Sequence, residues 1–233
     1  PQDGSEAKVR YPYYSFEVRN SKGETIDNSN SYYKAVEPLM REGFLQIAEG
    51  QNILFFEQEM RPSMQSESLM VIIERALKST GKLYKDLDYL AVTVGPGSFT
   101  GIRIGLAVAK GILYASNIQG IAINNFESAY YRMRMQIKEY DTAFVILNAY
   151  RNQVYVQQFM QNGTKTTPLL INNIDIINLL KQTKGNTICT GSGVPIIYPE
   201  LKNLDHLTIL PRFPIIRAIH VARLADDKIN KGD

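Results

Sequence analysis

A glycine-rich turn is the part of this sequence whose residue types and spacing best suit binding chemistry. It reads Gly95-Pro96-Gly97-Ser98-Phe99-Thr100-Gly101 and leads directly into an expected helix. Glycine allows positive φ and lets a backbone or a ligand approach closely, because it has no Cβ. Free amides at the start of a helix form a natural anion site. The turn therefore has the parts of a phosphate cradle.

Two known phosphate-binding patterns do not match this turn. No Gly-Lys-Ser/Thr closes it, as the phosphate loop of nucleotide hydrolases requires. The dinucleotide fingerprint fits Gly95 and Gly97, but the third glycine, Gly101, comes one residue late. Asn124 and Asn125 stand where an acidic residue should end the next strand. The alternative is a tight strand-to-helix turn whose glycines serve packing, and the local chemistry favours that alternative.

The side chains that could hold a metal or act as a nucleophile are few. His206 and His220 are the two histidines, and neither belongs to a His-x-x-x-His pair, so a mononuclear transferase-type metal site lacks its clustered ligands. Both are expected to be surface or packing residues. Cys189 has no local companion that would make it a nucleophile, and a small core residue is the simpler interpretation. One cysteine cannot form an internal disulfide, so a reducing compartment, the cytoplasm, is expected.

Composition excludes several classes of protein. The 233 residues are 44% hydrophobic and 21% charged, which is typical of a globular protein with a substantial core. A net charge of +3 without a Lys/Arg cluster is too small to predict nucleic-acid binding. The apolar runs are too short to span a membrane. No secretory signal precedes the expected fold, although the sequence begins at Pro1 rather than at a methionine.

The elements around the turn form two α/β halves that meet near residues 124–127. The first half has a strand at 53–58, a helix from 62 or 63 to Gly81, a strand at 87–94, a helix at 101–115 and a strand at 118–123; the last three make a βαβ unit. The second half has a helix at 125–139, a hairpin of strands at 143–148 and 153–158, a helix at 171–181 and a strand at 186–190. A closing helix follows at 216–229.

Two helices of the first half have apolar faces. The earlier helix carries Leu69, Ile72, Ile73 and Leu77 at helical spacing, and the later one carries Ile102, Leu106 and Leu113. The later helix also has a stripe of small residues at every fourth position, formed by Gly101, Gly105 and Ala109. Such a stripe lets a neighbouring helix or strand pack closely against it. The simpler interpretation is that both helices cover their own sheet. The sharper one is that part of this surface, including Ala109, meets a partner subunit.

The turn and its surroundings resemble the signature segment of the TsaB family, known earlier as YeaZ. The core Gly-Pro-Gly-Ser-Phe-Thr-Gly-x-Arg-x-Gly continues from the turn through Arg103 and Gly105, and the resemblance is strongest over residues 86–111. Flanking matches extend it over roughly residues 52–230. Asn148 stands where the family has the aspartate of Asp-Ala-Arg, and residues 191–193 stand near its Gly-Asp-Gly.

The resemblance implies a function as well as a fold. The implied fold is α/β, an actin-like two-lobed ASKHA (ribonuclease H-like) fold with mixed sheets flanked by helices. The implied role is that of a non-catalytic scaffold for threonylcarbamoylation of adenosine 37 in tRNAs that read codons beginning with A. The expected partner is a TsaD-type transferase, with a TsaE-type ATPase in the complex and tRNA contacted indirectly. No cofactor is assigned to this chain itself, although ATP or ADP at the partner interface is an expectation.

The resemblance also suggests how the chain divides. Residues 1–50 form an atypical N-terminal segment, residues 51–125 the first lobe, 126–215 the second lobe and 216–233 a C-terminal helix. Within 1–50 the sequence predicts one strand, Tyr13–Val18, and one helix, Tyr33–Ala48. The family opens with an apolar strand ending in Ile-x-Asp-Thr-Ser, for which Ile26-Asp27-Asn28-Ser29 is a weak match. Three explanations are open: a strand within 1–50 replaces it, the strand lies upstream and 1–50 are an insertion, or this copy is inactive.

Two further functional hypotheses are open at this stage. An ASKHA phosphotransferase or ATPase would need an acidic residue near the phosphates, and Asn148 in place of the aspartate argues against it. A homodimeric interaction protein would use the same two helices for itself.

Overall fold

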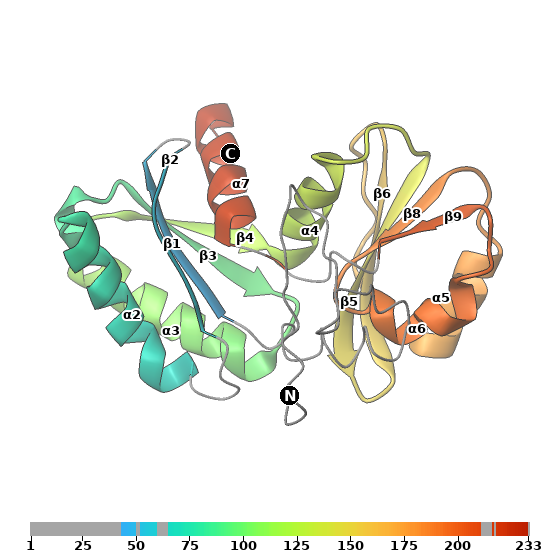
Figure 1. Ribbon diagram of the computed structural model, residues 1–233, viewed down its shortest axis with the longest axis horizontal. Helices are drawn as coiled ribbons and strands as arrows, with labels where there is room; N and C mark the ends of the chain where they lie inside the picture. The colour runs from blue at the N-terminus through green and yellow to red at the C-terminus, as the bar shows by residue number, and fades with distance from the viewer. Residues whose placement is uncertain (1–42, 50–51, 60–64, 211–215, 217, 233) are drawn as a thin grey trace, which may run out of the picture.

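The chain folds into two lobes that lie side by side (Figure 1). A computed structural model describes residues 43–49, 52–59, 65–210, 216 and 218–232. The strand and weak motif expected within residues 1–42 lie outside these described residues. Within the described ranges the first lobe extends from β1 to β4, and the second contains the sheet formed by β5 to β9.

The first lobe begins with an antiparallel pair of strands. β1 (Gly43–Glu49) pairs with β2 (Asn52–Glu59), and α2 (Gln65–Thr80) follows. The prediction of a helix over Tyr33–Ala48 is therefore wrong for residues 43–48. The apolar side chains of that stretch could be buried either by a helix or by a strand. Pairing with the neighbouring β2 stabilises the strand more than the local helical spacing stabilises a helix. α2 ends where Gly81 adopts a φ of 66°, as the expected C-terminal glycine should.

The predicted βαβ unit is confirmed. A short 3₁₀ turn (Tyr84–Asp86) leads into β3 (Tyr89–Gly95), α3 (Phe99–Ala115) crosses over, and β4 (Gln119–Asn124) pairs with β3 in parallel. Within the described residues the first lobe's strands form two separate pairs, β1–β2 and β3–β4.

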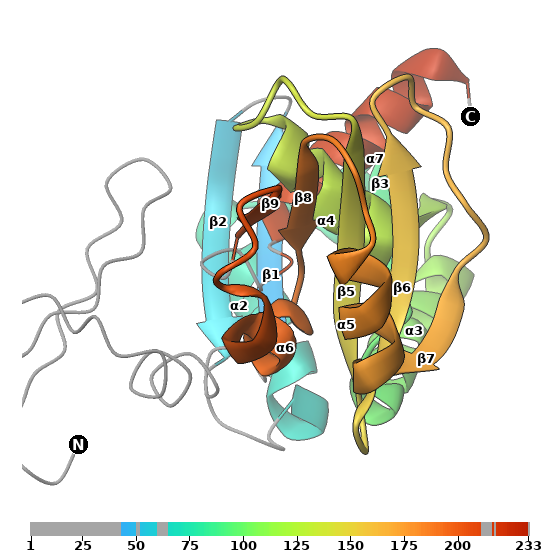
Figure 2. The same ribbon diagram turned by 90° about the vertical axis from the view of Figure 1, so that its right-hand side faces the viewer.

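The second lobe is built on a five-stranded mixed sheet in the order β7-β6-β5-β8-β9. Its elements are α4 (Asn125–Arg134), β5 (Thr142–Tyr150), β6 (Gln153–Met160), β7 (Leu169–Asn172), α5 (Asn173–Lys181), β8 (Thr187–Thr190), α6 (Val194–Leu201) and β9 (Leu207–Ile209). The predicted β5–β6 hairpin is confirmed, whereas β7, α6 and β9 are too short to have been predicted from periodicity. Figure 2 shows α5 and α6 on one face of this sheet and α4 on the other.

Strand alternation produces the two cores of this lobe. Phe144 and Ile146 of β5 face α5 and α6, while Ala143, Val145 and Leu147 face α4. The sequence predicted that α4 would continue to about Glu139, but the helix ends at Arg134. The chain turns there and brings Tyr140 into the core beneath α4.

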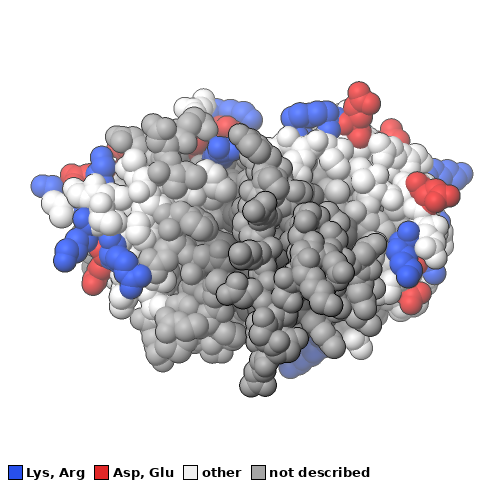
Figure 3. All heavy atoms as spheres, viewed as in Figure 1, with Lys and Arg blue, Asp and Glu red and all other residues white. Residues whose placement is uncertain are grey.

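The C-terminal helix returns to the first lobe. α7 (Ala218–Lys231) packs against β1, β3 and β4, and also against α4 of the second lobe. Its buried residues Val221 and Ala225 contact Ile123 of β4. Acidic and basic side chains are interspersed at the outer ends of both lobes (Figure 3). In the described part of the chain, no helix is both long and apolar enough to cross a membrane.

Candidate functional site

The glycine-rich turn joins the carboxyl end of β3 to the N-terminus of α3. Gly95 has a φ of 102°, and a Cβ at that position would lie 3.0 Å from Ile102 Cδ1. A Cβ on Gly97 would lie 3.2 Å from the side-chain nitrogen of Asn125, which donates a 2.9 Å hydrogen bond to the carbonyl of Pro96. Both glycines are thus needed for backbone conformation or close approach, which supports the packing role.

The amides at the start of α3 are partly used by the chain itself. Ser98 is the N-cap, and its hydroxyl accepts a 3.3 Å hydrogen bond from the amide of Gly101. Ser98, Phe99 and Thr100 are exposed. The guanidinium carbon of Arg103 lies 3.6 Å from the centre of the Phe99 ring, a cation–π contact on the exposed face of the helix. The remaining amides of this N-terminus are the part of the turn that an anion could approach.

Two motif positions that are far apart in the sequence meet in the second lobe. The amide of Asn148, near the end of β5, donates a 3.1 Å hydrogen bond to the hydroxyl of Ser192. Gly191 has a φ of 114°, and a Cβ there would overlap the carbonyl oxygen of Ile146. The amide of Gly193 donates a 2.8 Å hydrogen bond to that same oxygen. The residues that replace the family's Asp-Ala-Arg and Gly-Asp-Gly therefore share one structural junction.

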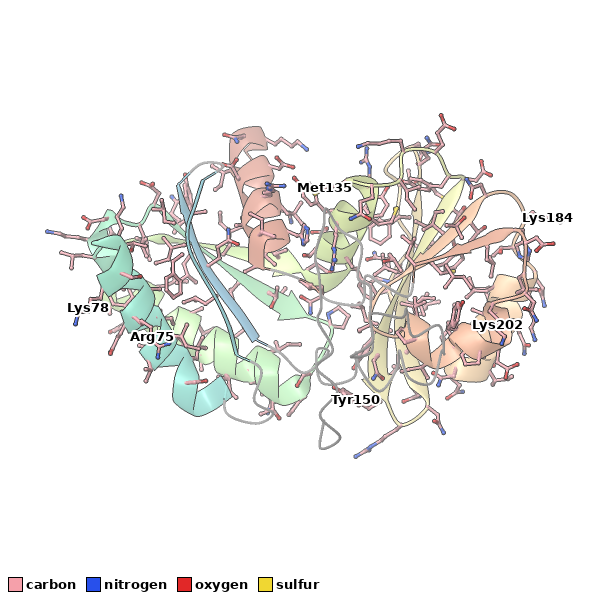
Figure 4. The ribbon with its side chains drawn as sticks, viewed as in Figure 1. Arg75, Lys78, Met135, Tyr150, Lys184 and Lys202 are labelled. Atoms are coloured by element: carbon pink, nitrogen blue, oxygen red, sulfur yellow. The ribbon has the colours of Figure 1, made fainter. Side chains whose placement is uncertain are left out.

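The β5–β6 turn has an unusual backbone that sequence patterns did not reveal. Tyr150, Arg151 and Asn152 have φ values of 62°, 52° and 61°, a region that residues with a side chain rarely adopt. Asn148 supports the turn, because its side-chain oxygen accepts a 2.8 Å hydrogen bond from the amide of Tyr150. Tyr150 is exposed at this end of the lobe (Figure 4). The signals that were missed are Asn152, a residue type that tolerates left-handed backbone, and Asn148, whose side chain can accept a hydrogen bond from a backbone amide two residues on.

The structure divides the predicted interface helices into an inner and an outer face. Ile72, Leu77 and Ala109 are buried, so these three positions belong to the core of their own lobe, and their assignment to a partner surface is corrected. Leu69, Ile73, Ile102, Leu106 and Leu113 are half-buried. The small-residue stripe through Gly105 faces β3, where a Cβ on Gly105 would lie 4.0 Å from Val92. The stripe lets α3 approach its own sheet closely.

The outer face of the same helices carries different residues. Met70 and Val71 of α2 and Phe99 and Tyr114 of α3 are exposed, and Tyr114 is 97% exposed. Ala107 and Gly111 of α3 are also exposed, and a Cβ on Gly111 would meet none of the described atoms within 4 Å. Arg75 and Lys78 extend from α2 toward the solvent (Figure 4). This outer face, which we call the α2–α3 face, combines apolar side chains, small residues and charged side chains.

The histidines and the cysteine take packing roles in the described structure. His206 lies with its Nε2 3.1 Å from the carbonyl oxygen of Leu180, and His220 is buried in α7. Cys189 is buried in β8, and burial raises the pKa of its thiol to about 12. Among the residues that the structure describes, no three His, Cys, Asp or Glu side chains gather in a group that could hold a metal ion.

Comparison with known proteins places this arrangement in a family. The family model for TsaD, tRNA N6-adenosine threonylcarbamoyltransferase, matches residues 63–193, more than half of the chain, and includes both glycine junctions. The chain belongs to the TsaD family. The resemblance to TsaB/YeaZ is confirmed at the level of the family.

Its relatives include both kinds of chain in that family. It is 30% identical over 132 residues to the "tRNA threonylcarbamoyladenosine biosynthesis protein TsaB" of Buchnera aphidicola subsp. Schizaphis graminum, covering 54% of this chain and 61% of that protein. It is 25% identical over 108 residues to the TsaB protein of Haemophilus influenzae, covering 46% and 45%. A tRNA N6-adenosine threonylcarbamoyltransferase of Erythrobacter litoralis is 34% identical over 89 residues, covering 38% and 26%. The chain thus spans about half the length of these TsaB relatives.

Solved structures confirm the fold. YeaZ from Pseudomonas aeruginosa superposes with a TM-score of 0.63 at 15% identity, covering 82% of this chain and 89% of that one. A Pseudomonas aeruginosa protein described as similar to peptidase YeaZ gives a TM-score of 0.66 at 16% identity, covering 83% and 89%. The expected actin-like ASKHA fold with two lobes of mixed α/β structure is confirmed.

Proposed function

We propose that this chain is a non-catalytic subunit of the tRNA threonylcarbamoyladenosine machinery and that it acts by binding a TsaD-type transferase. Membership of the TsaD family and similarity to two proteins named for threonylcarbamoyladenosine biosynthesis support the process. The sequence has two histidines, and neither belongs to a His-x-x-x-His pair, which supports a scaffold rather than a metal-dependent catalyst. Action in the cytoplasm, with a TsaE-type ATPase and tRNA in the wider assembly, is part of the same proposal.

The observation that carries the proposal is the α2–α3 face. Exposed Val71 and Met70 lie on α2, and exposed Ala107 and Gly111 lie four residues apart on α3, which packs against α2. Small residues at this spacing let a partner helix approach closely, and neighbouring apolar side chains gain from being removed from water. Helices of a related two-lobed subunit are therefore a suitable occupant of this face.

The experiment is co-expression with the TsaD-type transferase of the same genome, followed by size-exclusion chromatography. We expect a stoichiometric complex. Gly111→Leu should weaken the complex at least about tenfold, because the side chain enters open space in the free subunit but blocks a closely packed helix. Val71→Asp should weaken it as well, by placing a charge on the contact.

A matched control separates this face from apolar surface in general. Leu169 on β7 is exposed to a similar degree, 56% against 53% for Val71, and Leu169→Asp should leave the complex intact. If the folded wild-type chain elutes apart from the transferase, the proposal fails. If Leu169→Asp disrupts the complex while Gly111→Leu does not, the partner is bound elsewhere.

The same face favours a second candidate, a homodimer. Two copies could pair through Val71, Ala107 and Gly111 for the physical reasons given above. A chain that stays dimeric when the transferase is added in excess supports this candidate. If the chain instead acts as the transferase subunit proposed above, its homodimer should dissociate and the chain should enter the complex with the transferase.

An adenine nucleotide between the two subunits is a subsidiary proposal. The exposed N-terminus of α3, at Ser98, Phe99 and Thr100, is where this chain would contribute to holding its phosphates. Equilibrium dialysis of ATP against the complex and against each separate subunit tests it. If the transferase alone binds ATP as tightly as the complex does, this chain has no role in holding the nucleotide.

A further inference from the structure

The outer face of α3 carries positive charge that the helix itself does not balance. The helix contains Arg103 and Lys110 and no acidic residue, and both cations are exposed. No residue three or four positions before or after either of them is acidic, so neither has a carboxylate at the spacing that forms ion pairs along a helix. Among the described residues, neither takes part in an ion pair. Both charges are therefore available to a partner.

The two cations border the small residues of the α2–α3 face. Arg103 precedes Ala107 by four positions, and Lys110 lies between Ala107 and Gly111. The cations are seven residues apart, which is about two helical turns, so they project from the same side of α3 and are separated by about 10 Å along its axis. The ring of Phe99 lies 3.6 Å from the guanidinium carbon of Arg103 on this outer side. A helix that packs against the small residues therefore meets both charges.

α2 adds a third cation to the same face. Lys78 is exposed in the last turn of α2 (Figure 4), where a lysine also complements the helix dipole. The dipole does not account for Arg103 and Lys110, because both lie outside the last turn of α3. Together α2 and α3 contain four basic and two acidic residues, so +2 of the chain's net charge of +3 lies in these two helices.

Lys110 opposes the pairing of this face with a second copy of the chain. A twofold contact centred on Ala107 and Gly111 has its axis between these residues, and Lys110 then lies within about 2 Å of the axis along the helix. The Lys110 side chains of the two copies would come together. Like charges repel, and each would also lose hydration as the contact closes. A partner with carboxylates at this position avoids both costs.

We propose that the α2–α3 face recognises an acidic helical surface, with carboxylates opposite Arg103 and Lys110 and small residues between them. This inference rests on the proposed function and specifies the chemistry that the transferase presents at the contact. The two cations are then specificity-determining residues, because they attract an acidic partner and repel a second copy of this chain. Exposed Met70 and Val71 on the same face favour a protein over a nucleic acid, because a phosphate backbone would leave them in water.

The experiment measures the association and dissociation rate constants of the full chain with the transferase of the same genome. Between about 50 mM and about 500 mM NaCl we expect the wild-type association rate constant to fall at least about tenfold, because salt screens the attraction, while the dissociation rate constant changes less. At the lower salt concentration Lys110→Glu should associate about tenfold more slowly than the wild type. This variant should also lose most of the salt dependence.

Lys184→Glu provides the matched control. It changes the net charge by the same amount at an exposed position in the second lobe, far from α2 and α3 (Figure 4). Its association rate constant should stay within about twofold of the wild-type value. Both lysines are exposed, so both variants should fold, and circular dichroism spectra check this.

Self-association should depend on salt in the opposite direction. A wild-type homodimer, measured by sedimentation equilibrium, should weaken as the salt concentration is lowered, and a homodimer that strengthens overturns the inference. The inference is also overturned if the complex with the transferase forms at a rate that neither salt nor Lys110→Glu changes, and the proposed function then stands. A wild-type chain that binds no transferase at either salt concentration overturns the proposed function and this inference with it. Binding of tRNA by the chain alone that Lys110→Glu abolishes would assign the cations to nucleic acid and overturn the inference.

Discussion

At the residue scale, Cys189 illustrates how burial decides chemistry. The thiol lies in β8 among the side chains packed beneath α5 and α6, with none of its surface exposed. Removal from water disfavours the charged thiolate, so the pKa of the thiol rises to about 12. Since the thiolate is the reactive form, the native chain should be inert to thiol reagents at neutral pH.

This expectation is checked by labelling with Ellman's reagent. At pH 7.5 the folded chain should react at least about 100-fold more slowly than the same chain in concentrated urea, because reaction requires opening of the second lobe. Labelling of the folded chain at the rate of the unfolded one would contradict the burial of Cys189. A Cys189→Ser variant gives the background rate.

At the element scale, the turn between β8 and α6 tolerates a side chain at its glycine less well than the glycine-rich turn before α3 does. Gly191 combines a φ of 114° with a backbone oxygen, that of Ile146, which any added Cβ would overlap. The carbonyl cannot move easily, because it also accepts the hydrogen bond from Gly193. We therefore expect Gly191→Ala to lower the free energy of unfolding by about 3 kcal/mol or more, through backbone strain and displacement of β5.

Gly163 provides the matched control for this substitution. It also has positive φ, 90°, but none of the described atoms lies within 4 Å of its added Cβ. Gly163→Ala should therefore cost only the conformational term, about 1 kcal/mol. Urea titrations of both variants measure the difference. Equal losses in the two variants would show that the contact with Ile146 adds nothing to the backbone cost.

At the scale of the whole molecule, Glu127 joins the two lobes. Its carboxylate, on α4, lies 2.6 Å from the ammonium group of Lys165 in the loop after β6 and 3.0 Å from that of Lys228 on α7. Burial by itself would raise the pKa of Glu127, but the hydrogen bonds and charges of the two lysines outweigh it, and the pKa is lowered. The carboxylate thus connects a helix packed on the first lobe to a loop of the second.

The lowered pKa predicts how stability depends on pH. A carboxyl group whose pKa falls on folding stabilises the native state at neutral pH, and this contribution is lost as the pH falls below its ordinary value of 4.5. Glu127→Gln should lower the free energy of unfolding at pH 7 by about 1 kcal/mol, since the pairs are partly exposed. Between pH 7 and pH 3 the difference between the variant and the wild type should shrink, because the carboxyl group begins to take up its proton as the pH approaches the lowered pKa. Glu200→Gln, at an exposed position on α6, should have no effect at either pH.

Local sequence was sufficient for the elements that depend on neighbours in the chain. The βαβ unit around the glycine turn, the end of α2 at Gly81 and the β5–β6 hairpin were predicted because periodicity, turn residues and glycine conformations are local properties. The family was also recognisable, because its signature is one continuous segment, from residue 86 to 111. The short elements β7, α6 and β9 contain only about two periods of their pattern or fewer, so they could not be predicted.

Tertiary structure decided which faces are buried and which distant residues meet. Periodicity identified the apolar face of α2 and α3 but not its direction, and only packing showed that Ile72, Leu77 and Ala109 face their own lobe. The junction of Asn148 with Ser192, 44 residues apart, depends on the parallel pairing of β5 with β8. The helix expected over residues 43–48 became β1 because β2 was available as a partner. In each case the free energy of burying a side chain or pairing a strand depends on a partner that the local sequence does not contain.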